Sequence, residues 1–487
     1  MPPASVSSQP EPLEAVIGLE VHAQLATQTK IFCACSTAFG APPNSQTCPV
    51  CLGLPGALPV LNAAAVDAAI AAALSLECVV QPVSEFARKN YFYPDLPKGY
   101  QISQYDRPLA TGGRVALDVN GRRVTVGITR IHMEEDAGKS LHAADADATR
   151  TRIDLNRAGT PLIEIVSDPD LRSADAAAAY FEHVRDVLVA IGVSDGNLEE
   201  GSLRCDANVS VRALGATTFG TKVEVKNVNS FRFLQKAIDY EIARQSSAVA
   251  RGEAIAQETR LFDADTGRTV SMRSKEEAHD YRYFPEPDLP LLLVSASDVA
   301  RVRERLPELP HVRRERFVTQ YGLPPYDAGV LTQSREVADY FEQVAKTVAP
   351  KPASNWVMGE VLRRSKDEAA GITSAPVPPE SLAGLIAIVE AGTISGSVAK
   401  DVFETMWSTG DTASAIIARE GLVQIDDEAA LRGAIDEVLA ANADAVAKYR
   451  EGKTQSFGFL VGQVMKATGG KANPKVVNGL LRRVLEG

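Results

Sequence analysis

The sequence predicts an α+β protein: an N-terminal domain built on an antiparallel sheet, followed by two all-helical domains. Short runs of alternating polar and apolar residues, separated by turn signals, fill the first three hundred of its 487 residues. Beyond 289–298 the composition shifts to Ala, Leu, Glu, Lys and Arg at helical spacing. The predicted parts are a disordered Pro/Ser-rich lead at 1–14, the sheet domain at 15–299, and helical domains at 300–420 and 421–487.

Period-2 alternation describes the sheet domain in most detail. In the run 16–25 one face is apolar, and the opposite face carries Gly18, Glu20, His22 and Gln24. The runs 206–212 and 222–226 alternate in the same way, with Asp206 and Glu224 on their polar faces. We therefore expect a sheet with one face on a core and the other open. A solvated sheet face is the alternative for any one strand, but recurring acids and a histidine favour a functional site.

Four of the six cysteines form two close pairs, Cys33-x-Cys35 and Cys48-x-x-Cys51. In a chain of this length without a secretory signal, such clustering favours metal over disulfides. Four thiolates suit the tetrahedral shell of a structural Zn²⁺ and leave no position open for water. Four reduced, unrelated cysteines are the alternative. The isolated Cys78 and Cys205 are expected to be inert core residues.

Acids in unusual surroundings suggest a second kind of metal site. Glu164 lies inside the apolar run 161–166, and Glu134 and Glu135 follow a histidine in the segment IHMEED. A carboxylate among apolar neighbours needs compensation. A salt bridge from Glu164 to Arg157 would provide it, whereas a magnesium site for phosphoryl transfer is the sharper hypothesis. The tripeptide at 138–140 is no phosphate-binding loop, because the glycine required at position 133 is Met133.

Charge and hydropathy restrict the function classes. The net charge of −11 argues against nucleic-acid binding over the whole surface, yet residues 445–487 carry eight Lys or Arg against two Glu. Candidate contacts to RNA phosphates in this tail are Lys453, Lys466, Lys471, Lys475, Arg482 and Arg483. A solvated helical face is the alternative. The longest alanine-rich run, 63–76, is too short to cross a membrane, and residues 1–14 lack a secretory signal. Together these observations predict a cytoplasmic protein.

Several long segments resemble the B subunit of aspartyl/glutamyl-tRNA amidotransferase, the GatB family. They are VIGLEVH (16–22), KNYFYP (89–94), ITRIHMEED (128–136), DLNRAGTPLIE (154–164), EGSLRCDAN (200–208), DYRYFPEPD (280–288), FGFLVGQ (457–463) and ANP (472–474). The resemblance extends over nearly the whole chain beyond the first dozen residues.

This resemblance implies a cradle domain that holds ATP and magnesium. On the family pattern, His22, Glu135 and Glu164 match the catalytic metal ligands. Glu20, Asp206 and Glu224 match a second cation position, with Glu134 as a further candidate there. Lys89 and Lys98 are expected to meet phosphate or the tRNA acceptor end, with a solvated surface as the alternative. The cysteine loop resembles that of the zinc-bearing members, and other members lack it.

The resemblance further implies ATP-dependent amidation of Glu-tRNA(Gln) or Asp-tRNA(Asn). No Ser-Ser-Lys amidase constellation occurs in the sequence, so ammonia would come from a separate glutaminase, the A subunit, joined by the small C subunit in a heterotrimer. Two rivals stay open. One is a non-catalytic tRNA-binding adaptor, and the other is a free-standing ATP-dependent ligase that acts on a small amino acid.

Overall fold

The computed structural model describes residues 12–142, 151–274, 281–367, 371–423, 428–451, 453–469 and 472–486. The chain divides into two compact units, residues 1–309 and 310–487. The first unit contains the sheet, and the second is helical in its described parts. The α+β class predicted from sequence is therefore confirmed.

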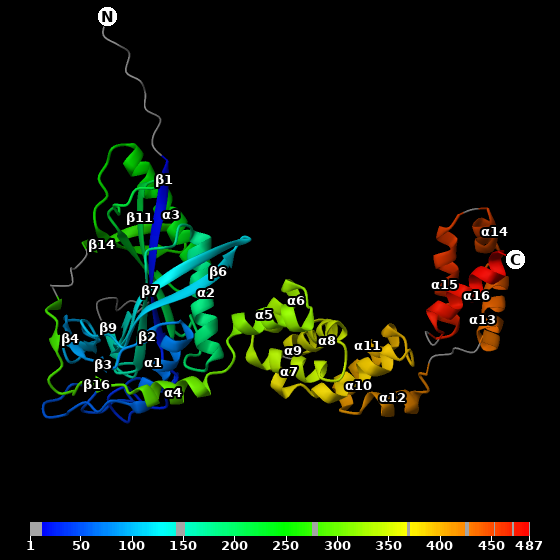
Figure 1. Cartoon of the computed structure of the whole chain (residues 1–487), viewed down its shortest axis with the longest axis horizontal. Helices are drawn as coiled ribbons and strands as arrows, with labels where there is room; N and C mark the ends of the chain where they lie inside the picture. The colour runs from blue at the N-terminus through cyan, green and yellow to red at the C-terminus, as the bar shows by residue number, and fades with distance from the viewer. Residues whose placement is uncertain are drawn as a thin grey trace, which may run out of the picture. The chain divides into compact units, whose positions relative to one another are not determined.

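A nine-stranded sheet forms the centre of the first unit (Figure 1). In spatial order its strands are β14 (Arg268–Ser274), β13 (Glu258–Asp263), β12 (Val223–Val228), β11 (Leu203–Ala213), β1 (Leu13–Gln24), β10 (Pro161–Ser167), β7 (Arg122–Glu135), β6 (Ala110–Val119) and β2 (Val79–Val80). Neighbouring strands are antiparallel except β12 and β13, which are parallel. The sheet is thus mixed at one position rather than antiparallel throughout.

The core lies on one face of this sheet. Ile17, Leu19 and Val21 of β1 are fully buried, because alternate residues of a strand point to the same side. Helices α2 (Ala174–Ala190) and α3 (Phe231–Ala250) pack on the sheet and bury their apolar stripes in the same core. Each begins at a serine whose side chain accepts a hydrogen bond from the helix backbone, as N-caps do.

Shorter strands support the polar face. A three-stranded sheet consists of β15 (Phe284–Pro285), β4 (Ala87–Asn90) and β5 (Tyr100–Ser103), and β5 packs against β7. Two-stranded sheets pair β16 (Leu292–Leu293) with β3 (Val83–Ser84), and β8 (Lys139–His142) with β9 (Thr151–Asp154). These elements frame the end of the large sheet where β7 finishes and β10 begins.

Two boundaries differ from the sequence prediction. Strand β1 already begins at Leu13, inside the segment 1–14 expected to be disordered, because it pairs with β11 along its whole length. Residues 1–11 lie outside the described part of the chain. The first unit also runs past the expected limit at 299: Val302 of α4 (Ala296–Arg305) joins its core, and Arg301 pairs with Asp67 of α1 (Ala63–Ser75) at 2.6 Å.

The second unit has two hydrophobic clusters. The helices of the first are α5 (Pro310–Tyr321), α6 (Pro325–Leu331), α7 (Arg335–Ala345), α8 (Pro350–Trp356), α9 (Leu362–Asp367), α10 (Pro379–Glu390), α11 (Gly396–Thr409) and α12 (Ala413–Glu420). Those of the second are α13 (Glu428–Ala441), α14 (Ala443–Arg450), α15 (Gln455–Ala467) and α16 (Pro474–Glu486). Gly421 ends α12 with a left-handed conformation, φ +59°. On α7, the helically spaced Tyr340, Phe341 and Val344 are buried and Val337 is partly buried against the same cluster.

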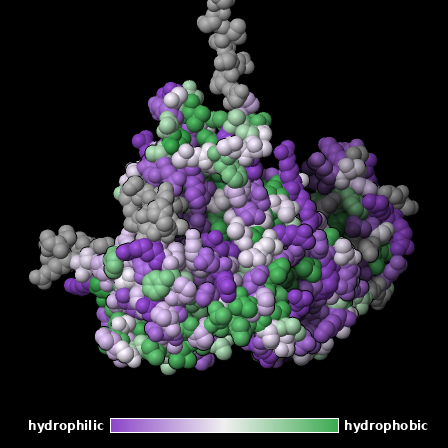
Figure 2. Space-filling view, turned by 60° about the vertical axis from the view of Figure 1, so that its left-hand side comes forward, coloured by the Kyte–Doolittle hydropathy of each residue, from purple (hydrophilic) through white to green (hydrophobic). Residues whose placement is uncertain are grey.

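Among the described residues, no helix combines the length and the apolar character that a membrane crossing requires. Hydrophilic side chains are spread over the face shown in Figure 2, between smaller apolar patches. Several acidic side chains and a histidine gather on the open face of the large sheet.

Candidate active site and metal centres

Three neighbouring strands bring His22, Glu134 and Glu164 together, with one ligand atom of each within 4.8 Å of the others. His22 on β1 lies directly opposite Glu164 on β10, and Glu164 lies opposite His132 on β7. The Glu164 Oε2 atom is 3.3 Å from His22 Nε2 and 3.4 Å from His132 Nε2. A second carboxylate, Glu134, is 3.6 Å from His132 Nε2. The cluster is therefore a product of strand register.

Burial and pairing set the charges in this first cluster. Burial disfavours the ionised carboxylate of Glu164, but His132 and His22 outweigh it and hold the pKa of Glu164 well below its usual range. Burial likewise opposes the charge on His132, whereas Glu164 and Glu134 raise the pKa of His132 to about 9. Burial also opposes the charge on His22, but Glu164 raises the pKa of His22 overall. Burial opposes the charge on Glu134, but His132 lowers the pKa of Glu134 overall. The lowered pKa values favour the ionised form of both carboxylates, which is the form in which a carboxylate can bind a cation.

A second acidic cluster adjoins the first. Glu20, Asp206 and Glu224 come from β1, β11 and β12, and their oxygen atoms also lie within 4.8 Å of one another. The Lys226 Nζ atom is 2.6 Å from Asp206 and 3.3 Å from Glu224. Burial raises the pKa of Glu20, and the charges of nearby carboxylates raise it further. Oxygen-only donors in this arrangement suit a hard divalent cation such as Mg²⁺.

The structure places Glu135 elsewhere. Glu134 and Glu135 are consecutive residues of β7, so their side chains point to opposite faces. Glu135 contacts the Lys98 ammonium and accepts a hydrogen bond from the Ile102 backbone at 2.8 Å. The resemblance assigned Glu135 to the ligands of the first cluster, whereas the geometry puts Glu134 in that position. Ser103 supports Glu134 by a hydrogen bond of 3.1 Å.

The two lysines expected to bind phosphate or RNA lie near different acids: Lys98 contacts Glu135, and Lys89 is near Glu134. The side chain of Lys98 is only 9% exposed, so it does not lie on a solvated surface. Lys98 and Glu135 line a cavity of about 180 Å³ that the cysteine loop closes on another side. The Lys89 ammonium lies 5.0 Å from the centre of the Tyr281 ring. Burial lowers the pKa of Lys89, but negative charge from neighbouring groups, including Glu134, raises it overall.

A second cavity, of about 270 Å³, lies beside the Glu20 cluster. Its lining includes Gly18 and Glu20 of β1, Asn208 of β11, and the loop residue Phe219, whose side chain is 59% exposed. A Cβ atom on Gly18 would approach other residues of the chain no closer than 3.8 Å. Packing within the chain therefore does not require a glycine there, and close approach of a ligand is one reason for such a residue in a strand.

An ion-pair network at the end of the polar face was not expected from the sequence. Asp136 is 3.0 Å from Arg204 and 3.7 Å from Arg157, and it accepts a hydrogen bond from Gln24 at 2.7 Å. Burial alone would raise the pKa of Asp136, but the two arginines lower it. Arg157 therefore compensates Asp136 rather than Glu164. Two signals were available: Asp136 is the last acid of the segment IHMEED, and Gln24 shares the polar face of β1 with His22.

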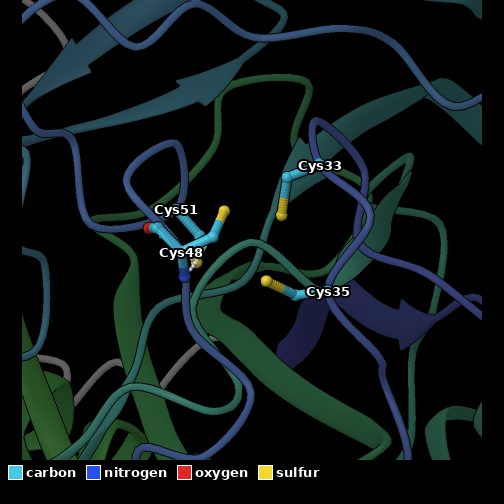
Figure 3. A group of neighbouring side chains, drawn as sticks. All are labelled: Cys33, Cys35, Cys48 and Cys51. Carbon is cyan, nitrogen blue, oxygen red and sulfur yellow. Dashed lines mark hydrogen bonds between the residues drawn. The ribbon is translucent and has the colours of Figure 1, made fainter.

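The four cysteines of the loop 33–51 converge, with their sulfur atoms turned toward one another (Figure 3). All four Sγ atoms lie within 4.8 Å of each other, and those of Cys48 and Cys51 are 3.9 Å apart. A tetrahedral zinc with Zn–S bonds of about 2.3 Å requires sulfurs about 3.8 Å apart. A hydrogen bond from the Cys33 thiol lowers the pKa of Cys51 to about 4. The set fits a structural Zn²⁺. Cys78 and Cys205 are buried in the core, as predicted.

The basic residues of the tail differ in their surroundings. Lys453, Lys466 and Arg482 are exposed, and Arg482 lies 5.4 Å from the centre of the Phe457 ring. Arg483 is exposed and pairs with Glu428 at 2.8 Å. Lys471 lies outside the described residues, and the side chain of Lys475 on α16 also falls outside the description.

Two family models match the chain. The first is described as the GatB/GatE catalytic domain and covers residues 15–300, and the second is a GatB domain over residues 339–485. The chain belongs to the GatB family. Its GatB/GatE segment contains the two acidic clusters, both cavities and the four-cysteine loop, and its second GatB segment contains the basic tail.

Curated relatives in the GatB family match over almost their whole length. A protein of Geotalea daltonii, named as the B subunit of aspartyl/glutamyl-tRNA(Asn/Gln) amidotransferase, is 59% identical over 97% of this chain and 99% of its own. Proteins with the same name from Myxococcus xanthus and Moorella thermoacetica are each 56% identical over 97% of this chain. They cover 98% and 99% of their own lengths, respectively.

Proposed function

We propose that this GatB-family chain is the catalytic B subunit of an aspartyl/glutamyl-tRNA amidotransferase. It uses ATP to activate the side-chain carboxylate of Glu or Asp on a mischarged tRNA, and ammonia then converts the activated group into the amide. Family membership supports this function, as does the printed name shared by the relatives. The observation that carries it is the pair of acidic clusters side by side on the open face of one sheet.

The order of groups along β1 supports a position for the nucleotide. Gly18, Glu20 and His22 follow one another on the same face, and they belong to the larger cavity, the second cluster and the first cluster, respectively. Four residues of strand span about 13 Å. This length suits a nucleotide with its nucleoside in the cavity and its phosphates over the acids. The terminal phosphate would then lie at His22, Glu134 and Glu164.

The residues of the two clusters fit magnesium, which supplies positive charge to the phosphates when bound. The chain's own task is to position the reactants. Glu164 and Glu134 hold negative charge at fixed points, and Lys89 supplies a cationic group near Glu134, where the phosphates or the acceptor end would lie. Lys98 supplies its ammonium at Glu135, on the other side of β7. The ion pair between Asp136 and Arg204 stabilises the end of the polar face next to His22.

The proposed reaction has two steps. A carboxylate oxygen of the tRNA-bound amino acid forms a bond to the γ-phosphorus, the bond to the β–γ bridging oxygen breaks, and ADP leaves. Ammonia then forms a C–N bond at the acyl carbon, the C–O bond to phosphate breaks, and the nitrogen loses a proton as inorganic phosphate departs. Activation is needed because the oxygen of a free carboxylate is a poor leaving group.

Partners and location complete the proposal. Ammonia would be supplied by the glutaminase, or A, subunit, with the small C subunit in the same heterotrimer, and the complex would act in the cytoplasm. Exposed basic residues of the last four helices, including Lys453, Lys466 and Arg482, would contact tRNA phosphates. The cysteine loop would hold a structural zinc.

The test is Glu164→Gln in the reconstituted complex, supplied with ammonia, ATP and mischarged tRNA. Amidation should fall by about two orders of magnitude or more, while tRNA binding persists. Glu199→Gln, at an exposed acid that belongs to neither cluster, is the matched control and should keep full activity. Unchanged amidation by Glu164→Gln would favour the adaptor. Glutamine made from free glutamate without tRNA would favour the free-standing ligase.

A further inference from the structure

The cysteine loop does more than surround a metal, because its last turn contacts Lys98. Gly53 follows Cys51 by two residues and has a left-handed backbone, φ +67°. A Cβ atom at Gly53 would overlap Lys98 Cγ and lie 3.3 Å from Lys98 Cα. The Gly53 backbone therefore packs directly on the stem of Lys98, at a distance that only a glycine permits.

The turn that carries Gly53 is tied to two of the thiols. The backbone N–H of Leu52 donates to the Cys48 carbonyl at 3.1 Å, and that of Gly53 donates to Val50 at 3.0 Å. The Cys48 N–H also points to Cys51 Sγ, 3.2 Å away. A metal held by Cys48 and Cys51 would therefore fix this turn, and with it the position of Gly53.

A buried lysine ties the same centre to the protein on its other side. Lys30 is fully buried, and its ammonium lies 3.6 Å from Cys51 Sγ and 3.3 Å from the Leu155 carbonyl. Its backbone N–H donates to the Cys35 carbonyl at 3.0 Å. The positive charge compensates the negative charge of a thiolate centre, because buried charges require such pairing. The loop is thus anchored both to the segment before β10 and to Lys98.

The charged end of Lys98 reaches Glu135. Its ammonium contacts Glu135, the neighbour in sequence of the cluster residue Glu134, and lies 5.4 Å from the centre of the Tyr100 ring. The stem of Lys98 is therefore held by Gly53 and its charged end by Glu135. The cavity of about 180 Å³ is lined by all three of these residues and by Cys51.

We infer that the metal-holding loop positions Lys98, with Gly53 as the positioning residue that keeps the ammonium against Glu135 in this cavity. The inference rests on the proposed metal at the four cysteines. Loss of that metal would release the turn 48–53, remove the support of the Lys98 stem and let the side chain leave the cavity. The zinc would thereby control the placement of the cationic group in this cavity, beyond its effect on fold stability.

The test measures the exposure of Lys98 directly. The full-length chain in its complex, loaded with zinc or stripped of it by a chelator and resupplied with Mg²⁺, is briefly treated with acetic anhydride, and acetylation of each lysine is read by mass spectrometry. Because the Lys98 side chain is 9% exposed, its release should raise its acetylation roughly tenfold. Lys89, near the acids but outside the loop, is the reference and should stay unchanged.

Two glycine variants separate this contact from backbone strain. Gly53→Ala should raise acetylation of Lys98 with zinc still bound, as measured by metal analysis. Gly40→Ala introduces the same kind of strain in the same loop, φ +80°, where a Cβ atom would meet nothing within 4 Å, and it should leave Lys98 protected.

Three results would overturn the inference: Lys98 staying protected after zinc removal, Lys98 and Lys89 rising together, or equal effects of the two alanine variants. The assay requires neither ATP turnover nor tRNA. Its failure is therefore distinguishable from a failure of the proposed amidation.

Discussion

Separate exchange of Glu134 and Glu135 for glutamine distinguishes the geometry of the first cluster from the assignment that family resemblance suggests. The two residues are adjacent in β7 but face opposite sides of the strand. Glu134 shares its cluster with His22 and Glu164, whereas Glu135 is engaged by Lys98. Glu134→Gln should therefore weaken Mg²⁺ binding strongly, and Glu135→Gln should not.

The loss of Mg²⁺ affinity expected for Glu134→Gln lies between two limits. A divalent cation 4 Å from a carboxylate is attracted by about 8 kcal/mol at an effective dielectric constant of 20, which sets the ceiling. Loss of a group one shell further from a metal already costs about 10- to 100-fold in affinity, which sets the floor. We expect Glu134→Gln to lower Mg²⁺ affinity by at least about 100-fold, or about 2.7 kcal/mol. Because Lys98 neutralises Glu135, Glu135→Gln should change the Mg²⁺ affinity by less than about threefold.

The assay is calorimetric titration of Mg²⁺ into the full-length chain, with amidation by the reconstituted complex at varied Mg²⁺ as a second measurement. Glu134→Gln should require far more Mg²⁺ for half-maximal rate. A loss of Mg²⁺ affinity in Glu135→Gln equal to that in Glu134→Gln would refute the reasoning and restore Glu135 as the ligand.

Three further predictions concern stability, zinc and RNA. Glu241 on α3 is fully buried and bonded to Arg244, Gln245 and Thr269; burial opposes its charge, but these bonds lower its pKa. Glu241→Gln should cost about 1–3 kcal/mol of unfolding free energy at neutral pH. Because the folded-state pKa lies below the unfolded value near 4.5, the difference from wild type in urea unfolding should persist above that pH and shrink below it. Cys48→Ser should lower bound zinc, measured by metal analysis, and lower the melting temperature. The double exchange of Lys453 and Lys466 for alanine should weaken tRNA binding and reduce the slope of log affinity against log salt by roughly one to two units, whereas an unchanged slope would exclude phosphate contacts at these lysines.

Local periodicity accounts for much of what the sequence predicted correctly. Alternation in β1 placed Glu20 and His22 on one face and Ile17 and Leu19 on the other, and the apolar set is buried as expected. In α7 the buried residues Tyr340, Phe341 and Val344 likewise recur at helical spacing. These assignments need only the chain's own repeat of two or 3.6 residues. The α+β class follows from them.

Contacts between distant segments account for what the sequence could not predict. Alternation along β7 would have placed Glu134 on the same face as His132 and Glu135 on the opposite face. Only the register of β7 with β10 shows which of these faces carries Glu164. The packing of Gly53 on Lys98 joins two irregular segments, for which no periodicity exists. The parallel pairing of β12 with β13 and the extension of the first unit to residue 309 are likewise set by tertiary packing.

The proposed chemistry requires the correct register of β1 with both neighbouring strands, β10 and β11. A slip of one residue would turn Ile17, Leu19 and Val21 outward and bury Glu20 and His22 in the hydrophobic core. One misplacement would thus destroy the cavity beside Glu20 and both acidic clusters at once. Substitutions that weaken the pairing of β1 should therefore produce a mixture of fully active and inactive molecules. They should not produce a population in which every molecule is slower.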